Sequence, residues 1–169
     1  MRRIAWTGLA LLLAAAPLTA QQKGSEAHEQ EAEHVQTPPA PYARWLVTRT
    51  VAGHAPVEAV EIAVVRDGVC RTIASTHAED VGEKCDDDEN GPMRSGRPSV
   101  EAPSAGDPVY DVTQALHDAD GNLIGAVGMD IRPGRMTRDA VLRVARTARQ
   151  EIEARIPSKE TLFGKPPRG

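Results

Sequence analysis

Aromatic side chains and long apolar runs are both scarce in this chain of 169 residues. Phe, Trp and Tyr together make up only 3% of the sequence, so Val, Ile, Leu and Ala must build the core, and little surface remains for stacking on carbohydrates or nucleobases. The longest apolar run lies at the N-terminus and is shorter than the roughly 18 to 20 residues that span a bilayer. The mature protein is therefore expected to be soluble rather than anchored in a membrane.

Positive charge is also in deficit, because the formal net charge of the chain is −4 at pH 7. Nucleic acids and anionic membranes attract basic surfaces, so this balance disfavours both as partners. The sequence lacks G-x-S-x-G, H-E-x-x-H and any glycine-rich phosphate loop. We therefore expect a protein that is not an enzyme and binds no cofactor. A small enzyme whose catalytic groups converge from distant positions is the least favoured alternative.

The first residues have the pattern of a secretory signal peptide. Arg2 and Arg3 form a positive start, residues 4–16 are mostly apolar, and the small residue Ala20 offers a cleavage point. We expect residues 1–20 to be removed and the mature protein to work in the periplasm or outside the cell. An uncleaved N-terminal anchor is the alternative. Cleavage takes the net charge from −4 to −6, because two arginines leave with the peptide.

The mature part is long enough for one domain with its own core and too short for two. Residues 21–41 are rich in Gln, Glu, His and Pro without apolar periodicity, which predicts a flexible polar lead-in. Residues 42–157 carry the periodic apolar patterns and are expected to form the single domain. Residues 158–169 are polar and contain two adjacent prolines, which predicts a disordered tail.

Cys70 and Cys85 are the two cysteines of the chain, and both lie in the mature part. In an oxidising compartment, two cysteines make one disulfide with none left over. Their separation of 15 residues does not match the C-x-x-C of redox catalysis or zinc ribbons. A structural disulfide is therefore the favoured interpretation, and a pair of free thiols or half of a metal site are the alternatives.

Apolar periodicity predicts a mixture of helices and strands. Helical spacing appears at both ends of the domain, and a short helix fits the acidic stretch between them. Alternating or continuous apolar runs predict strands, two pairs of which are joined by Gly-containing turns. The expected helices cover residues 42–51, 87–95 and 141–156, and the expected strands cover residues 57–65, 70–76, 98–101, 109–117 and 122–131.

Two acidic segments look like metal sites, and in each the sequence argues against a bound metal. Residues 86–91 match the first half of an EF-hand loop, but its twelfth position, which needs a bidentate Glu, is Arg97. Asp118, Asp120 and Asn122 beside a glycine are residues that a hairpin turn favours. We therefore predict no metal site.

Asp130 is a carboxylate inside an otherwise apolar strand. Burying an unpaired anion is costly, so a partner should face it. One interpretation is that Asp130 ends the strand and accepts hydrogen bonds from the backbone or from Arg132. The other is that it faces a ligand. The further polar groups expected to line such a pocket are Arg94, Tyr110, Asp111 and His117.

Residues 110–131, a hairpin with an Asp-Ala-Asp-Gly turn and an apolar second strand, resemble the terminal hairpin of Cache domains, the extracytoplasmic PAS-like sensors. Residues 73–76, 81–84 and 93–98 resemble the strand, the loop and the short helix that precede this hairpin in that family. The resemblance covers roughly residues 43–131.

The resemblance implies an α+β, PAS-like (Cache) fold. It has an antiparallel sheet of about five strands with N-terminal and C-terminal helices, and a small-molecule pocket between the sheet and residues 93–98. In relatives that bind amino acids, an aspartate at the place of Asp130 contacts the ligand amine, and an arginine, here Arg94, can meet a carboxylate. The aromatic and arginine residues typical of those relatives are not recognisable here, so the ligand class stays open.

The expected function is that of an exported small-molecule-binding sensor module without its own output domain. It would signal through a separate partner, such as a membrane receptor or another periplasmic protein, and a homodimer stays open. The alternative is a structural or protein-interaction module that binds no ligand and uses its sheet or its basic terminal helix as a docking face.

Overall fold

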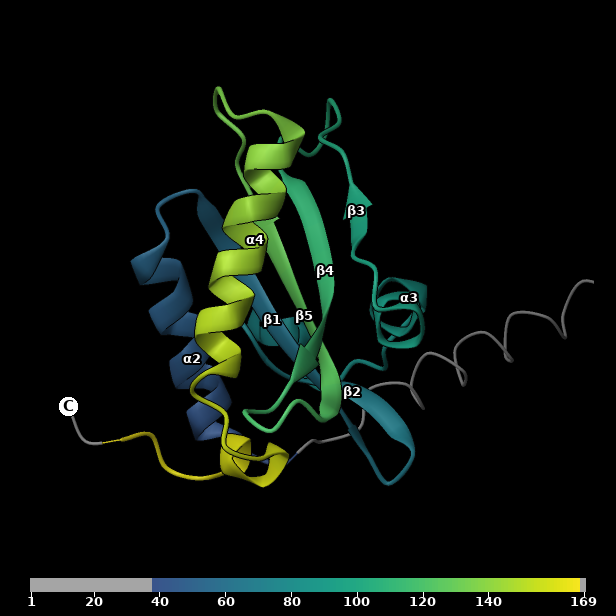
Figure 1. Ribbon diagram of the computed structural model, residues 1–169, viewed down its shortest axis with the longest axis vertical. Helices are drawn as coiled ribbons and strands as arrows, with labels where there is room; N and C mark the ends of the chain where they lie inside the picture. Colours follow the sequence, from purple (N-terminus) through teal and green to yellow (C-terminus); the bar gives the residue numbers. More distant parts are fainter. Residues whose placement is uncertain (1–37, 168–169) are drawn as a thin grey trace, which may run out of the picture. The chain divides into compact units, whose positions relative to one another are not determined.

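The computed structural model describes residues 38–167, which all belong to one structural unit. The predicted signal peptide lies outside the described residues, as does most of the predicted lead-in. The described part is α+β and contains a five-stranded antiparallel sheet and three α-helices (Figure 1). None of these helices is long and apolar enough to cross a membrane.

All five predicted strands are present. They are β1 (Val57–Arg66), β2 (Val69–Ser75), β3 (Ser99–Glu101), β4 (Tyr110–His117) and β5 (Leu123–Ile131). They pair in the order β2-β1-β5-β4-β3, and every neighbouring pair is antiparallel. The hairpins β1-β2 and β4-β5 are therefore joined through β1 and β5. β5 is the central strand, as its nearly continuous apolar sequence predicts.

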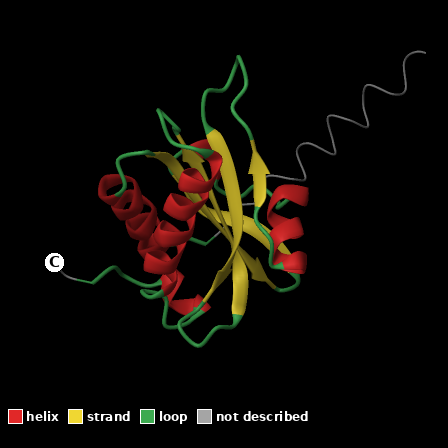
Figure 2. Cartoon of the chain, turned by 45° about the horizontal axis from the view of Figure 1, so that its top comes forward, coloured by secondary structure: helices red, strands yellow, loops and turns green. Residues whose placement is uncertain are grey.

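The three predicted helices are also present. They are α2 (Pro41–Gly53), α3 (Asp87–Ser95) and α4 (Arg138–Glu153). α2 and α4 lie side by side on one face of the sheet, and α3 lies against the other face beside β4 and β5 (Figure 1 and Figure 2). The sheet thus has a face covered by two long helices and a face that is only partly covered, by one short helix.

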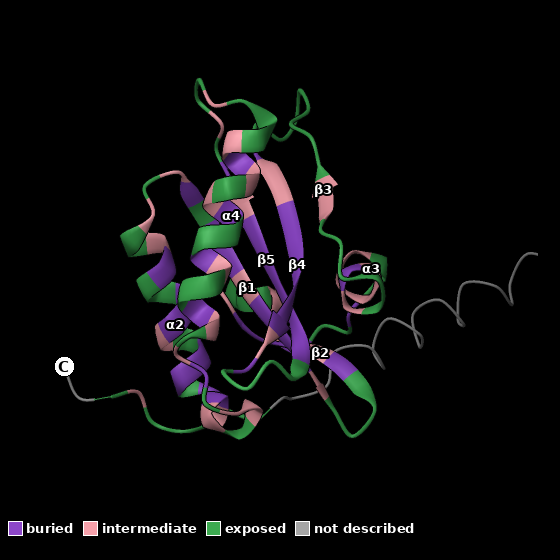
Figure 3. Cartoon of the chain, in the orientation of Figure 1, coloured by how far each residue is buried: buried purple, intermediate pink, exposed green. Residues whose placement is uncertain are grey.

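Strand alternation divides the buried apolar residues into two clusters. On β1, Ile62 and Val64 point into the large cluster under α2 and α4, whereas Ala63 points into a small cluster with Met93 of α3. Figure 3 shows the buried residues concentrated along the strands and on the inner sides of α2 and α4. The large cluster is the main core, and the face under α3 keeps room for polar side chains.

The domain extends further than predicted at its C-terminal end. Lys159–Phe163 form a short 3-10 helix, η2, that packs against α2, and Leu162 is fully buried in the main core. The prediction of a disordered tail from residue 158 is therefore wrong for these residues. One buried apolar residue in a polar stretch has no periodicity, so pattern analysis could not detect it.

Candidate functional site

Asp111 and Asp130 lie together at a pocket on the α3 face of the sheet. They stand opposite each other in register on β4 and β5. Both line a pocket of about 180 Å³. Arg132, which the sequence suggested as a partner of Asp130, instead forms an ion pair with Glu58, with 2.7 Å between Nη2 and Oε2. Two of the five predicted ligand-binding residues are thus brought together.

The other three predicted residues lie elsewhere. Arg94 is an exposed residue of α3, and its guanidinium lies 3.7 Å from a carboxylate oxygen of Asp87. Tyr110 packs against the main core under the helices. His117 is at the far end of β4, where its Nδ1 lies 3.1 Å from Oε1 of Glu153 in α4. Adjacent residues of a strand point to opposite faces, so Tyr110 and Asp111 cannot share one pocket, and His117 lies at the opposite end of β4 from Asp111.

Sequence analysis missed several residues of the pocket. Glu61 of β1 lines it, together with Ser75, His77 and Asp80. Glu61 carries the same signal as Asp130, a carboxylate within an apolar strand, and could have been found by the same argument. The other three come from the end of β2 and the polar loop that follows, including the 3-10 turn η1 (Ala78–Asp80), where polar residues are ordinary. The loop sequence gives no comparable signal.

Burial and mutual repulsion raise the pKa of three carboxyl groups in this pocket, those of Glu61, Asp111 and Asp130. Burial is the largest cause for Glu61, whose pKa rises to about 8, and the nearby charge of Glu89 raises it further. Burial and then the charge of Asp130 raise the pKa of Asp111 to about 6. The pKa of Asp130 is also raised, mainly by burial, although His77 partly opposes this.

The pocket has an excess of negative charge that its own lining does not neutralise. Four carboxyl groups and His77 line it, and none of the described residues in the lining is Lys or Arg. Between residues 38 and 167, no three His, Cys, Asp or Glu side chains are arranged to hold a metal ion. The chemistry that this lining supports is electrostatic attraction of a small positively charged group.

The two glycines of β5 have different roles, and only Gly128 lines this pocket. A Cβ on Gly125 would overlap the carbonyl oxygen of Ala63, so the absence of a side chain allows close approach of β1. A Cβ on Gly128 would lie 2.9 Å from Cγ of Glu61, which is its register partner on β1. Gly128 therefore leaves room for the Glu61 side chain on the pocket face of the sheet.

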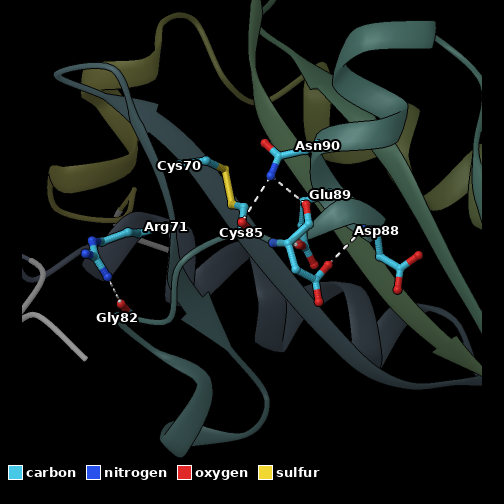
Figure 4. The surroundings of a disulfide bond; sticks show 8 residues. Cys70, Arg71, Gly82, Cys85, Asp88, Glu89 and Asn90 are labelled. Carbon is cyan, nitrogen blue, oxygen red and sulfur yellow. Dashed lines mark hydrogen bonds between the residues drawn. A yellow bond between two sulfur atoms is a disulfide. The ribbon is translucent and has the colours of Figure 1, made fainter. Parts of the chain in front are cut away.

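The disulfide between Cys70 and Cys85 is confirmed, and it holds the start of α3 to β2 (Figure 4). It is buried in the small cluster on the α3 face. The backbone N–H of Cys85 also donates to the carbonyl of Cys70 at 3.2 Å. Asn90 of α3 donates from Nδ2 to the carbonyl of Cys85 at 3.0 Å. α3 is thereby attached to the sheet directly before its first turn.

The acidic residues that resemble half an EF-hand loop cap α3. Oδ1 of Asp86 accepts from the backbone N–H of Asp88 at 2.8 Å, and Oε2 of Glu89 accepts from the N–H of Asp86 at 2.9 Å. This reciprocal pair is a capping box. In the β4–β5 turn, Oδ1 of Asp118 likewise accepts from the backbone N–H of Asn122 at 2.9 Å. Both segments use their carboxylates for backbone structure, a role that the sequence predicted for the β4–β5 turn only.

Two further pockets occur in the described part of the chain. One, of about 270 Å³, lies between α2 and α4 and is lined by three ionisable side chains, those of Arg49, Glu151 and Arg155. The other, of about 250 Å³, lies beside Pro38–Pro41 and contains one, that of Arg44. The acidic pocket gathers five such side chains and is therefore the candidate site.

Solved structures show the fold to be one already seen in sensor and regulatory proteins. A protein described as a GAF sensor from Burkholderia vietnamiensis aligns with 89% of this chain and 98% of its own at 10% identity and a TM-score of 0.52. A protein described as a transcriptional regulator from Rhodococcus sp. RHA1 aligns with 86% of this chain and 76% of its own at 7% identity and a TM-score of 0.51.

Similarity at such low identity shows the fold alone. No protein-family model matches the chain, and no curated protein matches it either. The expected α+β fold with a five-stranded antiparallel sheet is confirmed, and it is shared with a GAF sensor. Membership of the Cache family in particular stays a prediction.

Proposed function

We propose that this protein is an exported, non-enzymatic, small-molecule-binding module of the sensor type. It binds a small organic cation, such as a primary ammonium compound, in the acidic pocket, and passes its bound state to a separate partner protein. The shared fold with a GAF sensor supports the sensor type. The disulfide supports an oxidising compartment, as does the signal-peptide pattern. The acidic lining of the pocket supports a positively charged ligand.

The observation that carries this proposal is the group of four carboxyls without a compensating cation in the pocket lining. Asp111, with a pKa of about 6, is mostly ionised at pH 7, and Asp130 lies opposite it. A cationic ligand would relieve the repulsion between these groups and replace part of their lost hydration. The pocket volume of about 180 Å³ is below the roughly 300 to 1,000 Å³ of sites for drug-sized ligands, which favours a small ligand.

Titration calorimetry at pH 7 with 1,4-diaminobutane, ethanolamine and acetate tests this proposal. We expect the two amines to bind and acetate, which carries the opposite charge, not to bind. Asp130→Asn and Asp111→Asn should each weaken amine binding by roughly tenfold or more, because each removes a charge-assisted hydrogen bond. Asp120→Asn, in the exposed β4–β5 turn, is the matched control and should bind like the unchanged protein.

Two results would contradict the proposal. Amine binding that survives both pocket substitutions would place the ligand elsewhere. Absence of binding by either amine, in protein that keeps its disulfide and its fold, would remove the ligand-binding function. Export is tested separately, by N-terminal sequencing of the protein recovered from the periplasm, which should begin near residue 21.

The second candidate function is a protein-interaction module without a ligand. The observation in its favour is a group of exposed arginines on α4, formed by Arg138, Arg143 and Arg146. Such a group suits an acidic protein surface. This function would be favoured if no small molecule bound while charge reversal at these arginines abolished binding to a copurifying partner.

A further inference from the structure

Glu61 connects the pocket to helix α3. Its side chain lines the pocket, and its carboxyl group lies within hydrogen-bonding reach of the carboxyl group of Glu89. Two carboxyl groups can bond to each other only if one of them holds a proton, since an ionised carboxylate has no donor. The contact between the sheet and α3 at this point therefore depends on one shared proton.

The geometry indicates which residue donates. Oε2 of Glu89 accepts the backbone N–H of Asp86 in the capping box, which favours the ionised form of Glu89. Burial raises the pKa of both carboxyl groups. Glu61 has no such backbone donor and is the more buried of the two, and its pKa rises to about 8. Glu61 is therefore the protonated donor and Glu89 the acceptor.

The groups that face Glu61 from the surrounding elements keep it protonated. Glu89 faces it from α3, Asp80 from η1 and Asp111 from β4. Asp130 of β5 and His77 line the same pocket. Of these groups only His77 can carry a positive charge. The described surroundings therefore strongly disfavour ionisation of Glu61 while the pocket is empty.

We propose that the Glu61–Glu89 pair is a proton-linked clasp, which holds α3 to the sheet while the pocket is empty and opens when an organic cation binds. This inference rests on the proposed function. The ammonium group of the ligand takes the place of the proton beside Glu61, whose O–H bond breaks. The proton passes to the solvent, and the new Glu61 carboxylate pairs with the ammonium group. The hydrogen bond to Glu89 is lost, so ligand binding in the pocket releases this contact between α3 and the sheet.

Calorimetry of 1,4-diaminobutane binding at pH 7, in two buffers with different ionisation enthalpies, measures the proton directly. At this pH Glu61 still holds its proton in the empty protein, and we expect roughly 0.5 to 1 proton to be released for each diamine bound. Glu61→Gln keeps a donor for Glu89 but has no proton to release. It should bind with release below roughly 0.2 proton, whereas the Asp120→Asn control should match the unchanged protein.

Carbon NMR titration of Glu61 in the empty protein provides a test that needs no ligand. We expect its midpoint near pH 8 and a lower midpoint in Glu89→Gln, which removes the neighbouring charge but keeps the capping acceptor. A midpoint at the ordinary glutamate value would overturn the clasp. Diamine binding without proton release, or with equal release in Glu61→Gln, would overturn it and leave the proposed function intact. Absence of diamine binding in protein whose Glu61 titrates near pH 8 would instead count against the proposed function.

Discussion

At the scale of single residues, two glycines of β5 are needed for different reasons. Gly125 meets the backbone of β1, whereas Gly128 meets the flexible side chain of Glu61. A backbone atom in a paired strand cannot move without disturbing its register, but a side chain can rotate. The same substitution should therefore have different costs at the two positions.

We expect Gly125→Ala to lower the free energy of unfolding by about 3 kcal/mol or more, because the new methyl group overlaps the Ala63 carbonyl. Gly128→Ala should cost less, about 1 to 1.5 kcal/mol, and should act mainly by displacing Glu61. Urea denaturation at pH 7 measures both. Similar losses for the two variants would contradict this distinction.

The acidic residues of the site also differ in what their sequence context reveals. Glu61 and Asp130 are both carboxylates within apolar strands. This pattern indicates a functional residue in either case, but only Asp130 was predicted from it. Asp80 and His77 stand in a polar loop where such residues are ordinary. Their position at the pocket results from the path of the loop after β2, which short-range patterns do not describe.

At the scale of elements, the disulfide and the capping box together position α3. The disulfide closes a segment with a sequence separation of 15 residues that includes most of β2 and η1. Residues 87–95 form a short helix, and a helix of this length is marginal in water without tertiary contacts. Attachment at Cys85 and the cap at Asp86 compensate for this, which is why an acidic, glycine-containing stretch is helical.

Replacing both cysteines with serine should lower the free energy of unfolding by about 3 kcal/mol, the chain-entropy value for a loop of this length. α3 should lose more hydrogen-exchange protection than α4, because only α3 is attached through the bridge. Reducing agent added to the unchanged protein should produce the same loss of stability. Reducing agent should have no effect on the double variant, and a further loss there would point to a different target.

The 3-10 helix η2 lies in a segment for which the sequence predicted a disordered tail. Leu162 is fully buried beside α2, and the ring of Phe163 lies under the guanidinium of Arg66 at 5.3 Å. Leu162→Ala should lower the free energy of unfolding by about 2 to 5 kcal/mol, since it removes buried methyl groups and leaves a cavity. Lys165→Ala, at an exposed position three residues further on, is the control. A loss of less than about 0.5 kcal/mol at Leu162 would restore the interpretation of this segment as a loose tail.

At the scale of the whole molecule, the acidic pocket makes stability depend on pH. Glu61 and Asp111 have pKa values of about 8 and about 6, both above their ordinary values. Between pH 5 and pH 8 the folded protein therefore binds more protons than the unfolded chain. The stability that these two groups contribute is fully present below their unfolded pKa values and is lost as the pH rises through the folded ones.

We expect the free energy of unfolding of the empty protein to fall from pH 5 to pH 8, with each group contributing at most about 1.4 kcal/mol per pH unit. Glu61→Gln should flatten the curve between pH 6 and pH 8, where Glu61 titrates. Urea denaturation at intervals of one pH unit measures the curve, with Asp120→Asn as the control. A stability that rises over this range would show that the pocket carboxyls ionise at ordinary pH values.

The local structure of this protein follows from its sequence to a large extent. Apolar spacing predicts α2, α4 and the strands, because each element must place its apolar side chains on the buried side. The acidic turn between β4 and β5 was also identified correctly, since the carboxylate of Asp118 bonds to the nearest backbone N–H groups, whereas the capping box of α3 was not predicted. These interactions span a few residues, so sequence patterns contain them.

Only the tertiary structure decided the site. The pocket depends on the pairing of β1 with β5 and of β5 with β4, which brings Glu61 near Asp111 and Asp130 from more than 45 residues away. Within β4, strand alternation turns Tyr110 to the face opposite Asp111, and His117 lies at the other end of the strand. The pKa of a carboxyl group depends on burial and on neighbouring charges, which exist only once the chain has folded. The sequence by itself thus determined the elements, and the folded arrangement determined which of their polar side chains meet.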